Sequence, residues 1–157
     1  MKIKTTFLKI VTAILDIFLL FFVYALAWGT YSSIVDHSVV HLQLLSVGFL
    51  FAAALVAFGI SYYLFRIFFL MDKQQFFTKS SLHSVKMIRN LFVILFFALS
   101  GIMPYIYYSA DRGDAPGMII IVGAVVFVPL AIAAFVSAME QILIKAINMK
   151  DENDLTI

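Results

Sequence analysis

Four ionisable residues lie inside or at the edge of apolar stretches, and they are the side chains best placed to do chemistry: Asp16, Arg66, Arg89 and Glu140. Asp16 follows Lys9 by seven residues, which is about 10 Å at the rise of an α-helix. Arg66 and Glu140 have comparable depths from the nearest charged flank. An ionisable group inside a membrane is costly and marks a candidate functional site.

Two acids and two bases at similar depth predict one polar cluster, in which Asp16 and Glu140 face Arg66 and Arg89 approaches from a third helix. Such a cluster could be an ion-paired feature that fixes how the helices align. It could also be a proton or ion site, or a docking crevice. Since the cluster offers a base for each acid, the sequence favours the ion-paired, structural interpretation.

Other kinds of reactive site have little support. The chain contains no cysteine, which excludes disulfides and thiolate chemistry. His37 and His41 have the four-residue spacing of a helical metal site, and Asp36 is the one nearby third ligand, but ordinary interfacial histidines are favoured. We find no Ser-His-acid set, so we expect a protein that is not an enzyme and holds no cofactor or metal.

The composition requires a bilayer around these residues. Hydrophobic residues make up 64% of the 157 residues and charged residues 13%, against roughly 45–50% and about 25% in soluble domains. Four stretches reach the roughly 20 apolar residues that a membrane-spanning helix needs. The sequence therefore predicts an all-α integral membrane bundle of four transmembrane helices, a single domain over residues 1–157, with helices at about 10–28, 42–64, 91–108 and 118–139.

The basic residues predict the orientation of these helices. Of the 11 Lys and Arg residues, all except Arg112 lie in the N-terminal flank, in the tail at about 145–157, or between the second and third predicted helices, where Arg66 precedes the loop at about 72–90. Because positive charge is retained on the cytoplasmic side, both termini and this loop are expected in the cytoplasm. The chain is then a multi-pass protein of the cytoplasmic membrane. Pro104 and Pro129 are expected to kink the third and fourth helices.

The predicted cytoplasmic segments supply candidate partner-binding residues: Lys73, Phe76, Phe77, Asp151, Glu152, Asp154, Leu155 and Ile157. The third helix is expected to extend back into the loop, with Thr78 or Ser80 as its cap. The loop could instead rest on anionic headgroups. The tail could be a frayed terminus, or it could contact a basic protein by filling a pocket or adding a strand.

Three stretches carry a family resemblance: ADRGDAPG (residues 110–117), ENDLTI (152–157), and the loop from MDK to FFT (71–78). They resemble the YoaS-like family of small bacterial four-helix membrane proteins of unknown function (DUF 2975). That resemblance implies a bacterial protein that is one member of a pair of proteins encoded side by side. This member lies in the membrane, and the other is a very small helix-turn-helix regulator. The resemblance implies no catalytic or ligand-binding residues.

Two functions follow from these observations. The first is a non-enzymatic regulatory membrane protein that binds and sequesters a small cytoplasmic helix-turn-helix regulator. The second is a small ion- or proton-coupled transporter that acts as an oligomer, because four helices would need a second copy to enclose a pathway. Faces of small residues permit a homodimer. Without a basic run, no direct contact with nucleic acid is expected.

Overall fold

The computed structural model describes residues 2–36 and 40–154, with the backbone alone for residues 2–4, 153 and 154. Helices fill almost all of this described chain, and no strand occurs in it. Their bounds are α1 (Lys2–Val35), α2 (His41–Asp72), α3 (Lys79–Ser100), α4 (Met103–Arg112) and α5 (Gly117–Asp154). The helical fold class predicted from apolar stretches is confirmed.

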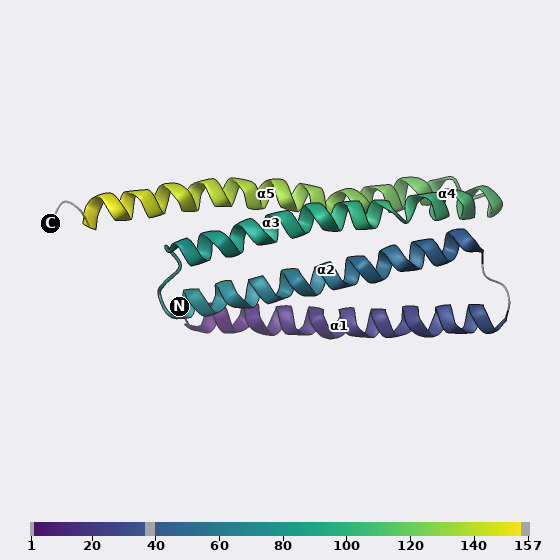
Figure 1. Ribbon diagram of the computed structural model, residues 1–157, viewed down its shortest axis with the longest axis horizontal. Coiled ribbons are helices and arrows are strands. Elements are labelled where there is room, and N and C mark those ends of the chain that lie inside the picture. The colour runs from purple at the N-terminus through teal and green to yellow at the C-terminus, as the bar shows by residue number, and fades with distance from the viewer. Residues whose placement is uncertain (1, 37–39, 155–157) are drawn as a thin grey trace.

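Four spans are long and apolar enough to cross a bilayer: Thr5–Val35, His41–Asp72, Lys79–Arg112 and Gly117–Glu152. The third combines α3 and α4. Successive spans run in opposite directions, so the chain's two ends and the α2–α3 loop lie at one end of the molecule (Figure 1). We call this the basic end. There α5 extends beyond the other helices (Figure 1).

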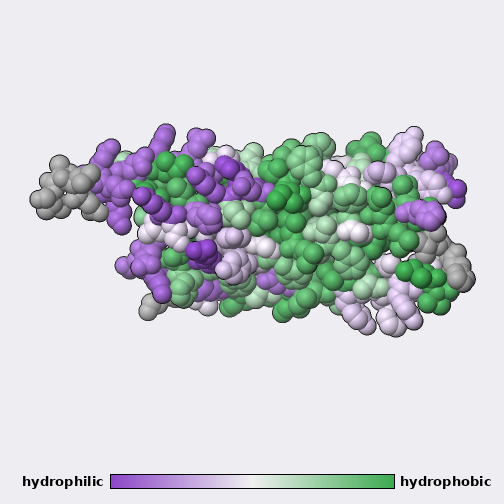
Figure 2. Space-filling model, in the orientation of Figure 1, coloured by the Kyte–Doolittle hydropathy of each residue, from purple (hydrophilic) through white to green (hydrophobic). Residues whose placement is uncertain are grey.

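The helices form a row rather than a closed ring. α2 packs against α1 and α3, and α3 packs against α5. Helix α1 is therefore an edge helix, and large apolar side chains such as Phe18 and Phe21 are exposed along it. Figure 2 shows the result: a hydrophobic band crosses the middle of the molecule, and hydrophilic side chains gather at the basic end. Lipid tails are the natural cover for such a band.

The third span is interrupted where α3 meets α4. Gly101 and Ile102 form a turn there, and Pro104 lies in the first turn of α4, where a missing N–H costs little. The ring of Phe49 on α2 lies against Gly101 so closely that a Cβ atom would overlap it. Position 101 therefore favours glycine because the Phe49 ring lies so close to its backbone, and not because the backbone has a positive φ angle. Pro129 lies within α5, which continues past it.

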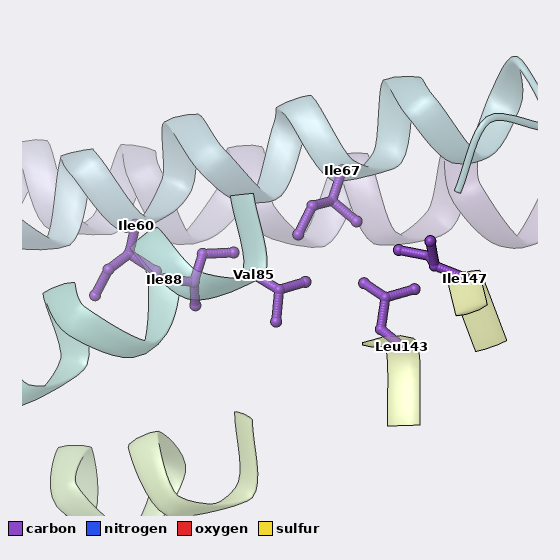
Figure 3. Close-up of a cluster of buried hydrophobic side chains, with 6 residues drawn as sticks. All are labelled: Ile60, Ile67, Val85, Ile88, Leu143 and Ile147. Carbon is purple, nitrogen blue, oxygen red and sulfur yellow. The ribbon is translucent and has the colours of Figure 1, made fainter. Parts of the chain in front are cut away.

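A buried apolar cluster ties three helices together near the basic end. Its side chains come from α2, α3 and α5 and point toward one another (Figure 3): Ile60, Ile67, Val85, Ile88, Leu143 and Ile147. Leu143 and Ile147 lie beyond the predicted end of the fourth helix at about 139. Their burial explains why α5 runs on as a helix through most of the segment expected to be a tail.

Helix α3 begins where the sequence predicts, but the predicted side-chain hydrogen bond that would cap its N-terminus is not formed. The helix begins at Lys79, inside the predicted loop, with Thr78 in the N-cap position. The predicted cap by a side chain is wrong, because the Thr78 hydroxyl donates to the carbonyl oxygen of Gln75 over 2.8 Å. Ser80 does not cap the helix either; its hydroxyl oxygen accepts a hydrogen bond from Arg66.

Candidate functional site

The most buried charge in the described chain belongs to Glu140 on α5, whose side chain is 7% exposed. Arg89 Nη1 on α3 donates to its Oε2 over 2.6 Å, and Lys86 Nζ lies 3.9 Å from its Oε1. Lys86 and Arg89 are three residues apart and share a helix face, so one acid is held by two bases. A charge this buried is tolerated because it is paired.

Asp16 lies elsewhere, on the face that α1 turns toward α2. The hydroxyl of Ser61 donates to its Oδ1 over 2.5 Å. On the same helix Thr12 is buried and its hydroxyl donates to the carbonyl oxygen of Leu8 over 2.9 Å. No cation is paired with Asp16 among the residues that the structure describes. This carboxyl is therefore held by a hydroxyl within a membrane span.

Arg66 projects toward a different neighbour again. Its Nη2 donates to the hydroxyl oxygen of Ser80, at the start of α3, over 3.3 Å. Nearer the end of the molecule, Lys9 of α1 forms an ion pair with Asp72 of α2. Both side chains of that pair are about one-third exposed, so it is worth at most about 1 kcal/mol.

The structure thus divides the predicted cluster. It brings Arg89 to Glu140, as expected, but the predicted contacts of Arg66 with Asp16 and Glu140 are wrong. Asp16 and Arg66 contact two different serines. Three residues of these contacts are not among those predicted from the sequence for the cluster: Ser61, Ser80 and Lys86. Lys86 could have been found, since it shares the helix face of Arg89. No sequence pattern indicates that the two serines would contact Asp16 and Arg66.

The candidate partner-binding loop is partly fixed to the helices. Phe76 is half-buried against the apolar cluster, and its ring meets that of Phe77 edge to face, with centroids 5.4 Å apart. Phe77 is 50% exposed. The ammonium of Lys73 lies over the ring of Phe69, 4.3 Å from its centroid. Phe77 is therefore an exposed large apolar side chain of the loop, open to a partner or to the bilayer.

The candidate tail is helical as far as the structure describes it. Asp151 and Glu152 are exposed on the last turn of α5, and the backbone of Asp154 closes that turn. The predicted contact through the apolar end of the tail, by filling a pocket or adding a strand, depends on residues beyond this helix. Leu155 and Ile157 lie outside the described residues, as does His37.

Metal binding has no support in the described part of the chain. No group of three or more His, Cys, Asp or Glu side chains comes together there. His41 is the first residue of α2, and Asp36 follows the end of α1. These positions are helix ends, which is compatible with the interpretation of ordinary interfacial residues.

The four apolar spans and their charged ends define a multi-pass protein of the bacterial cytoplasmic membrane. The chain belongs to the family described as Protein of unknown function (DUF2975), whose family model matches residues 25–157. It is 29% identical over 160 residues to the uncharacterized membrane protein YoaS of Bacillus subtilis (strain 168), with 99% of each chain covered. No solved structure matches it.

Proposed function

We propose that this protein is a non-enzymatic regulatory membrane protein that binds and sequesters a small cytoplasmic DNA-binding protein of the helix-turn-helix type. The observation that carries the proposal is the overhang of α5, which leaves the row of helices as a continuous helix and ends in exposed acidic residues (Figure 1). DNA-binding proteins carry basic surfaces. An exposed acidic helix end is complementary to such a surface.

The inferred orientation supports this assignment. Ten of the 11 Lys and Arg residues belong to the segments at the basic end, and the positive-inside rule directs that end to the cytoplasm. The exposed ring of Phe77 and the acidic end of α5 are then available to one cytoplasmic partner. The resemblance to the membrane half of a regulatory pair implies the class of that partner.

Affinity purification of the tagged protein from its native membrane, in mild detergent and followed by mass spectrometry, tests the proposal. A small DNA-binding protein should accompany the wild type and be lost from the D151N/E152Q variant. The matched control is D111N/D114N, which removes the same charge from the last turn of α4 and the turn that follows it. Loss in both variants, or retention in both, would remove the acidic end of α5 as the docking site.

Asp16 favours the alternative, a small ion- or proton-coupled transporter acting as an oligomer. A carboxyl within a span, held by the Ser61 hydroxyl, is a recurrent feature of ion pathways. The row of four spans would need a second copy to enclose such a pathway. Flux into proteoliposomes that depends on Asp16 and stops in the Asp16→Asn variant would favour transport over sequestration.

A further inference from the structure

An apolar groove lies near the basic end, where α3 packs against both α2 and α5. It has a volume of about 320 Å³. Leu64 and Met71 of α2, Met139 and Ala146 of α5, and Phe77 of the loop line it. Leu64 is eight residues from Asp72 at the end of α2, or about 12 Å at helical rise. The groove therefore runs inward from the membrane boundary into the depth of the acyl chains.

The polarity and depth of the groove decide what fits it. Its lining side chains are almost all apolar, and it lies at the depth of the lipid acyl chains. An apolar groove offers water no hydrogen-bonding partner. A hydrocarbon chain is the occupant that matches.

Two lysines lie close in the chain to residues that line this groove. Lys79 follows Phe77 by two residues, and Lys150 is one helical turn beyond Ala146 on the same face of α5. Both are exposed, and no ion pair in the described chain involves them. Lys9, Lys86 and Arg89, by contrast, are engaged by carboxylates.

We propose that the basic end holds an anionic phospholipid, with one acyl chain in the apolar groove and the phosphate between Lys79 and Lys150. Asp151 and Glu152 leave this site accessible because they follow Lys150 on other faces of the helix. The inference goes beyond the proposed sequestration and does not depend on it, since the site is built without a protein partner.

Native mass spectrometry of the purified protein with added lipid tests the proposal. Phosphatidylglycerol should bind more tightly than phosphatidylcholine. The K79Q/K150Q variant should bind phosphatidylglycerol roughly 25-fold more weakly, at about fivefold for each lysine near a phosphate. Its affinity for phosphatidylcholine, in which the choline cation offsets the phosphate charge, should fall by a smaller factor. The control K73Q/R112Q removes the same charge from two residues that lie against aromatic rings, Phe69 and Tyr108, and should bind as the wild type.

A second variant tests the groove separately from the charges. Ala146→Trp fills it and should weaken both lipids, while K79R/K150R should keep the preference for phosphatidylglycerol. Thermal unfolding in detergent verifies that each variant is folded. Equal affinity for the two lipids in the wild type, equal losses in K79Q/K150Q and the control, or unchanged binding in Ala146→Trp would overturn the proposal. So would competition by glycerol phosphate at concentrations equal to those of the lipid.

Discussion

Arg89 on α3 and Glu140 on α5 form an ion pair across the interface of their helices, with Nη1 and Oε2 2.6 Å apart. The acid is buried and the base is about one-third exposed. Lys86 approaches the other carboxylate oxygen. Because this interface lies beside the apolar cluster of α2, α3 and α5, the pair fixes the alignment of α3 and α5 at the end where a partner is proposed to dock.

Removing one member of this pair should destabilise the protein. Glu140→Gln leaves Arg89 without its carboxylate, and Arg89→Gln leaves a buried charge held by Lys86 alone, so each should cost about 2–3 kcal/mol. Lys86→Gln should cost under about 1 kcal/mol, because Lys86 is half-exposed and 3.9 Å away. Unfolding in detergent gives these values. The double variant should lose less than the sum, and strictly additive losses would show that the pair contributes nothing.

Asp16 should couple to Ser61 and not to Arg66. Both Asp16→Ala and Ser61→Ala break the same hydrogen bond, so their combined loss of stability should fall short of the sum by about 1 kcal/mol. The Asp16→Ala and Arg66→Ala losses should add, because their partners differ. Two double-mutant cycles measure this. Coupling with Arg66 in place of Ser61 would contradict the arrangement described.

Gly101 should be intolerant of a methyl group. Gly101→Ala drives a Cβ atom into the ring of Phe49, which is a rigid obstacle, and should cost about 1–3 kcal/mol. Gly48→Ala is the control: no atom lies within 4 Å of its added Cβ, so stability should be unchanged or slightly higher. Thermal unfolding compares the two. Equal tolerance at both positions would mean that α2 and the α3–α4 turn are not in close contact.

The orientation can be tested directly because the chain has no cysteine. A single cysteine at Gln75, in the α2–α3 loop, should react with a membrane-impermeant maleimide only after the cells are opened. A cysteine at Asp111, in the last turn of α4 at the other end of the molecule, should react in intact cells. We expect this pattern because the lysines and arginines at the basic end keep that end in the cytoplasm. The reverse pattern would place the proposed docking surface outside the cell.

The spans could be predicted because they depend on apolar length along a helix. A cationic partner for Glu140 could be predicted because a buried charge must be paired, and Arg89 is that partner. The pairing of Asp16 with Arg66 could not, because depth does not fix rotation. Arg66 follows Ser61 by five residues and so projects roughly 140° away from the face that meets Asp16. The helical tail could have been predicted from the sequence, because the buried residues Glu140, Leu143 and Ile147 recur at helical spacing. No sequence pattern predicts the contact of Phe49 with Gly101, since it forms only when two distant segments of the chain meet.

Sequestration is tested most directly by following the DNA-binding partner in cells. With the wild-type protein, the partner should be recovered mainly in the membrane fraction. In the D151N/E152Q variant it should move to the soluble fraction, and transcription from its promoter should change as it does when the gene for the membrane protein is deleted. The D111N/D114N control should behave as the wild type. A partner that stays in the membrane fraction of D151N/E152Q cells, or a promoter that does not respond when the partner is released, would contradict the account.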